Sequence, residues 1–103
     1  MIYGTWATKE VQINGVTLRP ESSQAIMNHS PDGFNWGFGG SGPAQLALAL
    51  LFHYAELDQT KRWYEKFKAD VIAILPQSDF EIPESLVRDW IEAQTRREAT
   101  KNA

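Results

Sequence analysis

The stretch from Gly33 to Leu51 restricts the fold more than any other part of this 103-residue chain. Aromatic side chains occupy every second position from Phe34 to Phe38, which predicts a strand with one aromatic face. A glycine-rich loop, residues 39–42, follows, and Pro43 is placed to open an apolar helix. Backbone N–H groups of such a loop can hold an anion. No nucleophile, metal cluster or basic patch of firm spacing accompanies the loop, so the segment indicates a geometry and not a reaction.

Length and composition limit the classes of protein that remain. A chain of this length forms one domain and buries about two-thirds of its unfolded surface. It has no cysteine, which excludes disulfides and thiolate zinc sites and fits a reducing cytosol. The net charge of −3 argues against nucleic-acid binding, which needs a clustered excess of Lys and Arg. The longest apolar run, residues 44–52, is too short to span a bilayer. We therefore expect a soluble, cytoplasmic protein without a membrane partner.

The distribution of charge predicts where the core lies. Between Ser22 and Ala55 the only formally charged residue is Asp32, whereas residues 56–103 hold ten acidic and eight basic residues. The middle of the chain is therefore expected in the core, and the second half is expected to supply solvated helix faces. We predict a single domain over residues 1–94, followed by a polar, frayed C-terminal tail over residues 95–103.

The N-terminal part of the chain has the pattern of short strands. Residues 2–7 and 10–20 alternate apolar and polar side chains, and Asn14-Gly15 divides the second run into a hairpin. This dipeptide is a strong hairpin signal because a type I′ turn needs positive φ at both central positions. A third extended piece is expected over residues 24–28. Residues 30–33, Ser-Pro-Asp-Gly, match a type I turn that leads into the aromatic strand.

The remainder has the pattern of three helices. The first, Pro43 to Tyr54, is apolar nearly all round, which is typical of a buried central helix. The second, residues 60–75, carries large apolar residues at intervals of four. The third begins near Pro83, after a short edge strand over residues 80–82. The predicted fold class is α+β: a small antiparallel sheet with an N-terminal hairpin, packed against three helices.

The glycine-rich segment comes close to three known motifs and completes none with its required context. Residues 37–42 match G-x-G-x-x-G, but no repeated βαβ units surround them. A P-loop needs a lysine and a hydroxyl residue where Pro43 and Ala44 stand. Ser41 resembles the nucleophile of a G-x-S-x-G elbow, but Pro43 replaces the last glycine. We therefore expect Ser41 to be the N-cap of the helix.

The two histidines give no metal-ligand spacing. They lie 24 positions apart, so neither a metal site nor a cofactor is predicted. His53 is expected to be a packed or half-exposed helix residue. His29 lies in an uncharged, turn-rich segment near the loop, where an imidazole can donate to a backbone carbonyl or face a ligand. A structural role is favoured for it.

Residues 28–50, which read NHSPDGFNWGFGGSGPAQLALAL, resemble the signature of a family of short prokaryotic, plasmid and phage proteins catalogued as a domain of unknown function. The resemblance extends more loosely over most of the chain, including the Asn14-Gly15 hairpin. The family pattern has Glu and Tyr where this chain has Asn35 and Phe38. The resemblance thus implies that neither a carboxylate nor a phenol at these positions is an indispensable catalytic group. It implies no activity, and its phage and plasmid context implies an accessory factor of a mobile element.

Two functions from different classes remain open. We predict a non-enzymatic binding or interaction protein whose partner is a protein or a small anionic ligand, because the loop region offers glycine, aromatic and amide groups without an acid–base pair. The candidate ligand-binding residues are His29, Asn35, Trp36, Gly37, Gly39, Gly40, Ser41 and Gly42. The alternative is a small enzyme acting on a phosphate-bearing or acyl substrate, with His29 as base and the helix N-terminus as anion hole. In a third, purely structural interpretation the loop only lets the aromatic strand cross the buried helix closely.

Overall fold

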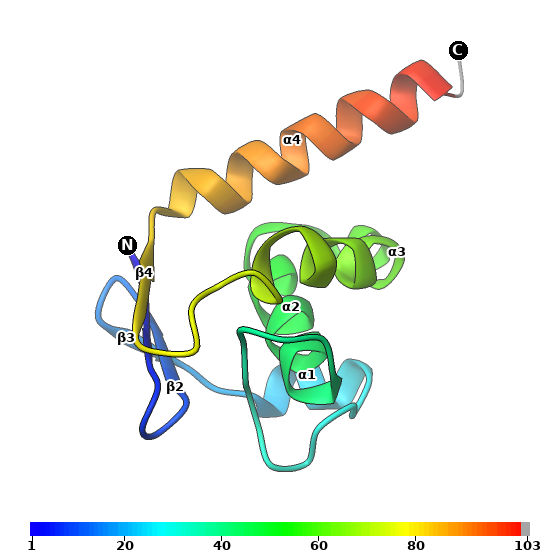
Figure 1. The fold of residues 1–103 in the computed structure, drawn as a ribbon. Helices are drawn as coiled ribbons and strands as arrows, with labels where there is room; N and C mark the ends of the chain where they lie inside the picture. Colours follow the sequence, from blue (N-terminus) through cyan, green and yellow to red (C-terminus); the bar gives the residue numbers. More distant parts are fainter. Residues whose placement is uncertain (102–103) are drawn as a thin grey trace.

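A computed structural model describes residues 1–101 and shows an antiparallel sheet on one side of a group of helices (Figure 1). The sheet contains β1 (Ile2–Thr5), β2 (Glu10–Ile13), β3 (Val16–Leu18) and β4 (Phe80–Ile82), in the order β3-β2-β1-β4. All neighbouring strands are antiparallel. The α+β fold class is confirmed, and β4 is the edge strand that the sequence predicts.

The hairpin between β2 and β3 forms at the predicted dipeptide. Asn14 has a φ of 52° and Gly15 a φ of 81°, as a type I′ turn requires. The turn pairs Ile13 with Val16 and Val11 with Leu18. This register directs both apolar pairs to the face of the sheet that looks toward the helices.

The helical part of residues 1–101 contains four α-helices and one π-helical turn. These are α1 (Glu21–Ile26), α2 (Ser41–Tyr54), α3 (Leu57–Phe67), η1 (Lys68–Ile72) and α4 (Glu84–Lys101). None of the helices within residues 1–101 combines the length and the apolar character needed to cross a bilayer.

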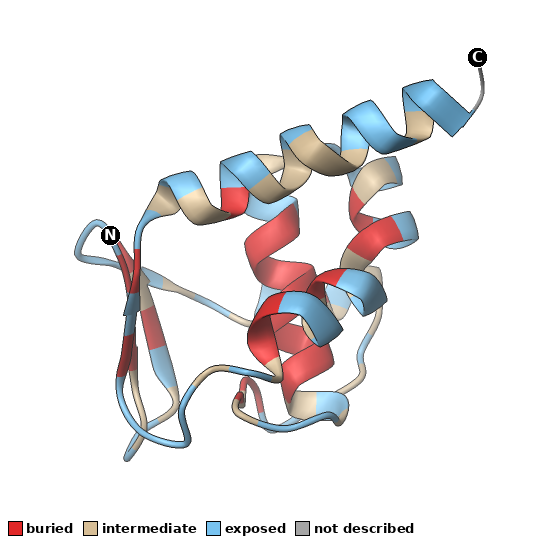
Figure 2. Ribbon diagram, turned by 45° about the horizontal axis from the view of Figure 1, so that its top comes forward, coloured by how far each residue is buried: buried red, intermediate tan, exposed pale blue. Residues whose placement is uncertain are grey.

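Helix α2 is the centre of the core, as its uniformly apolar sequence predicts. It contacts α1, α3, η1 and α4, and every residue from Pro43 to Leu51 is buried. Figure 2 shows this buried stretch beside the buried side of the sheet. A helix surrounded on all sides needs no polar face, which is why α2 lacks one.

The predicted third extended piece, residues 24–28, is wrong, because residues 24–26 form the second half of α1. Pro20 occupies the N-cap position of α1, and its carbonyl accepts the Gln24 N–H at 2.9 Å and the Ser23 hydroxyl at 2.7 Å. Proline followed by an acidic first turn favours a helix start. The segment is too short for its apolar spacing to distinguish helix from strand. The number of helices is therefore larger than the predicted three.

The predicted aromatic strand is also wrong. Residues 34–36 lie outside every helix and strand of the described chain and pair with no neighbouring strand. Instead, the Gly37 N–H donates to the carbonyl of Ile72 at 3.0 Å, and Gly37 has a φ of 82°. Phe34 and Trp36 are buried, but Phe38 is 40% exposed, so the three aromatic side chains do not share one face; a pattern of period two does not specify a hydrogen-bonded partner.

The last two predicted helices differ in their ends. The second divides into α3 and η1, where the Ala73 N–H donates to the Lys68 carbonyl, five residues earlier. Helix α4 starts at Glu84, close to the predicted position, and continues through residues 95–101, where a frayed tail is predicted. Its last turns carry a contact with α3, since Glu98 accepts a hydrogen bond from the Trp63 indole at 2.7 Å. Residues 102–103 of the predicted tail lie outside the described residues.

Candidate functional site

Trp36, a predicted contact residue, is part of the core. Its side chain is fully buried, and the indole N–H donates to the carbonyl of Ser78 at 2.9 Å. The ring packs edge-on against Trp6 and Phe80, with centroid distances of 5.6 Å and 4.8 Å. A buried ring cannot touch an external ligand, so its assignment as a surface contact is corrected to a packing role.

Two of the glycines in the segment allow close packing. A Cβ on Gly42 would lie 2.6 Å from the Cβ of Asn35, and a Cβ on Gly37 would lie 3.0 Å from the carbonyl oxygen of Leu75. Both distances are shorter than van der Waals contact. The Asn35 side chain in turn accepts the N–H of Trp36 at 2.9 Å. These contacts agree with the structural interpretation of the loop.

The exposed part of the loop is small. Gly39 and Ser41 are exposed, and a Cβ on Gly39 would meet open space. Gly40 is the N-cap of α2 and has extended backbone geometry. Ser41 is the first helical residue and its side chain makes no capping hydrogen bond, so the predicted N-cap role of Ser41 is wrong. The following proline removes one of the orphan N–H groups that a cap would serve.

His29 makes its contacts with α2 and α3. Its backbone N–H donates to the Gln45 side-chain oxygen at 2.9 Å, and its Nε2 lies 3.0 Å from the hydroxyl of Tyr64. Burial, followed by the charge of Glu65, raises the pKa of the Tyr64 hydroxyl above its ordinary value. The phenol thus stays protonated at neutral pH and can donate to the imidazole. The structure thus separates the predicted site residues: His29 contacts α2 and α3, Trp36 lies in the core, and Gly39 and Ser41 lie at the exposed part of the loop.

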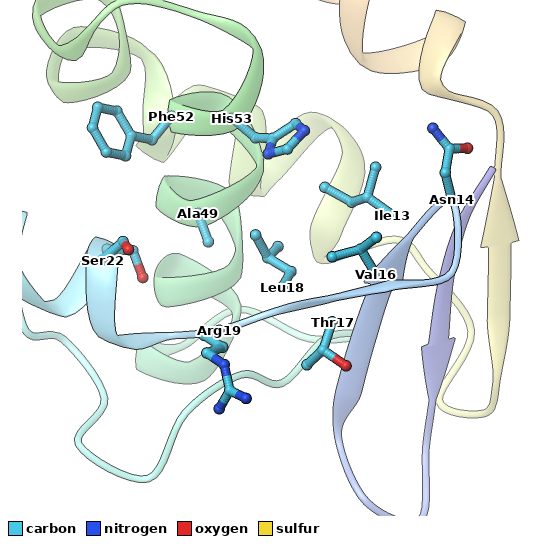
Figure 3. Close-up of a pocket in the computed structure, with 11 residues that line it drawn as sticks. Ile13, Asn14, Val16, Thr17, Leu18, Arg19, Ser22, Ala49, Phe52 and His53 are labelled. Carbon is cyan, nitrogen blue, oxygen red and sulfur yellow. The ribbon is translucent and has the colours of Figure 1, made fainter.

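A concave surface lies elsewhere, between β3 and α2. This β3–α2 groove has a volume of about 710 Å³. Figure 3 shows Leu18 from the sheet and Ala49 from α2 pointing toward one another, whereas the ring of Phe52 extends away from the strands. Its lining residues are Ile13, Asn14, Val16, Thr17, Leu18, Arg19, Ser22, Ser23, Ala49, Phe52 and His53. The sequence did not predict the groove, because its walls come from the hairpin, α1 and α2, which are separate segments of the chain that only the tertiary fold brings together.

The groove combines exposed apolar side chains with few charges. Val16 is 71% exposed and Phe52 is 39% exposed, although both lie at the junction of sheet and helix. The ionisable lining side chains are Arg19 and His53. Neither takes part in an ion pair within the described part of the chain. The sequence gives one signal for this surface. The Asn14-Gly15 turn pairs Val16 with Ile13, which places an apolar residue at the start of the terminal strand β3.

The remaining chemistry of the described residues is sparse. Over residues 1–101, His, Asp and Glu side chains form no group of three or more that could hold a metal ion. The main buried polar cluster is Gln45 with Ser23, and its side-chain atoms are satisfied by hydrogen bonds. The described residues thus offer an open groove and a buried polar cluster whose hydrogen bonds are satisfied.

Comparison with known proteins gives a family and no relative of established activity. The sequence model of a family described as "Family of unknown function (DUF6166)" matches residues 4–93. No curated protein and no solved structure matches the chain.

Proposed function

Because the chain belongs to the DUF6166 family, a family of unknown function, we propose a function from its own geometry: it is a non-enzymatic binding protein whose contact surface is the β3–α2 groove. The single observation that carries this proposal is the incomplete cover of the inner sheet face. Ile2 on β1 and Val11 and Ile13 on β2 are buried in the core that includes α2, whereas Val16 on β3 remains 71% exposed beside the groove.

The dimensions and lining of the groove support a binding role. Its volume of about 710 Å³ falls within the range of about 300–1,000 Å³ that is common for ligand sites. The lining also combines apolar side chains with polar ones that could orient a ligand, as ligand sites do. Exposed Phe52 and Val16 contribute apolar surface that a partner can remove from water.

The groove supports binding better than the glycine-rich loop does. Asn35, Trp36, Gly37 and Gly42 are occupied by packing or by internal hydrogen bonds, as described above. The imidazole of His29 is engaged with Tyr64, so no observation favours the alternative of a catalytic base at this position.

The proposal is tested by an NMR screen of the ¹⁵N-labelled protein against a library of apolar and anionic fragments. We expect chemical-shift changes at the amides of Val16, Leu18, Ala49, Phe52 and His53. Phe52→Glu places a charge in the groove and should abolish these changes, because an unpaired charge is costly to bury under a ligand. Ile74→Glu is the matched control, since Ile74 is an equally apolar residue that is 76% exposed and lies outside the groove.

Changes confined to residues 39–42 would contradict the proposal and return the contact surface to the loop. Fragments that bind Phe52→Glu as well as the unaltered protein would contradict it as well.

A further inference from the structure

We infer that the β3–α2 groove receives an extended acidic peptide segment, which adds as a new strand to the free edge of β3 and places a carboxylate beside Arg19. This inference rests on the proposed function and names the class of partner for that site. It follows from three properties of the groove: an unpaired strand edge, a division of side chains between two faces, and the sign of the charge.

The first property is the free edge of β3. Within residues 1–101 this strand is terminal in the sheet order β3-β2-β1-β4 and pairs with β2 alone. A two-residue hairpin closes on a hydrogen-bonded pair, here Ile13 with Val16, and hydrogen-bonded pairs then alternate along the ladder. Thr17 therefore directs its N–H and C=O away from β2. These two groups can pair with the backbone of an added strand.

The second property is the alternation of side chains at this edge. Val16 and Leu18 point toward α2, whereas Thr17 points to the other side of the strand (Figure 3). An added strand has the same period of two. Its inward side chains would lie against Phe52 and Ala49, and its outward side chains would lie beside Thr17 and Arg19. The inward positions thus require apolar residues.

The third property is charge. Arg19 and His53 are the ionisable side chains among the lining residues, in a chain whose net charge is −3. Glu10 and Asp32 do not line this groove; together with Lys9 they line a smaller depression that shares Thr17, Leu18 and Arg19 with it. An acidic residue at the outward positions would form a cross-strand pair with Arg19. A second copy of the chain would instead bring another Arg19 and His53 to the same edge, so the charge favours an acidic partner over self-association.

The test is a selection of random dodecapeptides displayed on phage against the full-length protein, followed by affinity measurements on synthetic copies. We expect enriched peptides to alternate apolar residues with Asp or Glu. Thr17→Pro removes the outward N–H without removing a bond to β2, and we expect it to weaken binding about tenfold. Thr17→Val keeps that N–H and should bind as the unaltered protein does. Arg19→Glu reverses the charge and should weaken binding by about tenfold or more, with a smaller effect at high salt.

Each result has a distinct meaning for the two proposals. Peptides that bind Thr17→Pro without loss, yet lose affinity for Phe52→Glu, overturn strand addition and leave the groove as the contact surface. A selection that enriches no peptide overturns the inference, while shifts of the groove amides by hexanoate would then identify a small carboxylate as the occupant and keep the proposed function. Enriched peptides that are insensitive to Phe52→Glu contradict both proposals.

Discussion

The side-chain oxygen of Gln45 accepts the backbone N–H of His29 at 2.9 Å, although Gln45 lies fully buried in the central helix α2. The same oxygen accepts the N–H of Ser30 at 3.0 Å, and the amide nitrogen donates to the Ser23 hydroxyl and to the Met27 carbonyl. One side chain therefore serves four groups, one in α1 and three in the segment that connects α1 to the loop. Its burial is stable because none of its polar atoms lacks a partner.

Gln45→Leu should lower the free energy of unfolding by about 2–4 kcal/mol, because it leaves the partly buried N–H groups of His29 and Ser30 without an acceptor. Urea unfolding monitored by tryptophan fluorescence measures the effect. Gln94→Leu, a change of the same chemistry on α4, should alter the stability by less than about 0.5 kcal/mol. Equal effects of the two substitutions would contradict the anchoring role.

Gly42→Ala should destabilise the fold by about 1–3 kcal/mol, because the added methyl group would lie 2.6 Å from the Asn35 Cβ and 3.2 Å from its backbone nitrogen. Gly39→Ala is the matched control, since its methyl group would meet open space. Thermal unfolding of both variants provides the comparison. A Gly42→Ala protein as stable as Gly39→Ala would show that the close approach of loop and helix is not required.

Trp36→Ala should destabilise the protein by about 3–5 kcal/mol, as expected for truncation of a fully buried aromatic residue. The substitution also leaves the Ser78 carbonyl without its donor. Phe38→Ala is the control from the same segment, because Phe38 is exposed, and its effect should be small. Chemical denaturation of the two variants separates the buried aromatic from the exposed one, and similar losses would argue against the observed burial of Trp36.

The contribution of Asp70 to stability should depend on pH. The indole N–H of Trp90 donates to its carboxylate at 2.9 Å, and Lys66 pairs with the same oxygen at 3.2 Å. The hydrogen bond from Trp90, assisted by Lys66, lowers the pKa of Asp70 below its ordinary value. A carboxylate with a lower pKa in the folded state stabilises the fold above its unfolded pKa of about 4, and this contribution disappears as the pH falls through the folded pKa.

The difference in unfolding free energy between the unaltered protein and Asp70→Asn should therefore be largest near neutral pH and should shrink below about pH 4. Denaturation at a series of pH values measures it. Asp89→Asn, at an exposed carboxylate on α4, serves as the control. A difference that stays constant down to about pH 3 would show that the carboxylate has the same pKa in the folded and unfolded chains.

The elements that the sequence predicts well are those with a local cause. The turn at Asn14-Gly15 requires positive φ at two successive positions. Few dipeptides other than Asn-Gly, Asp-Gly and Gly-Gly adopt this conformation readily. Helix α2 is apolar on all sides, so its burial depends on no particular neighbour. The start of α4 follows from Pro83 and the acidic Glu84 beside it.

The features that the sequence does not predict depend on distant partners. The segment of Trp36 resembles a strand, but its neighbours are the carbonyls of Ile72 and Ser78, which a local pattern cannot reveal. The β3–α2 groove lies between segments that are far apart in the sequence, since residues about 30 positions apart, such as Leu18 and Ala49, both line it. A glycine-rich loop suggests a ligand site, yet the absence of a side chain at Gly42 is explained by its close contact with Asn35.

Truncation of the chain after Gln94 tests whether the C-terminal turns of α4 are part of the folded domain. It removes Glu98, which accepts the indole N–H of the buried Trp63 at 2.7 Å and pairs with Arg62 at 3.3 Å. We expect a loss of about 1–3 kcal/mol, the usual range for a partly buried hydrogen bond to a charged group, together with a change in tryptophan fluorescence. Glu98→Gln keeps an acceptor for Trp63 and should lose less stability, whereas Glu92→Ala removes only an exposed pair with Arg96 and should have little effect.

If the truncated chain were as stable as the full chain, residues 95–101 would behave as the frayed tail that their polar composition predicts. A loss that Glu98→Gln largely avoids would instead assign the stabilisation to the single contact between α3 and the end of α4.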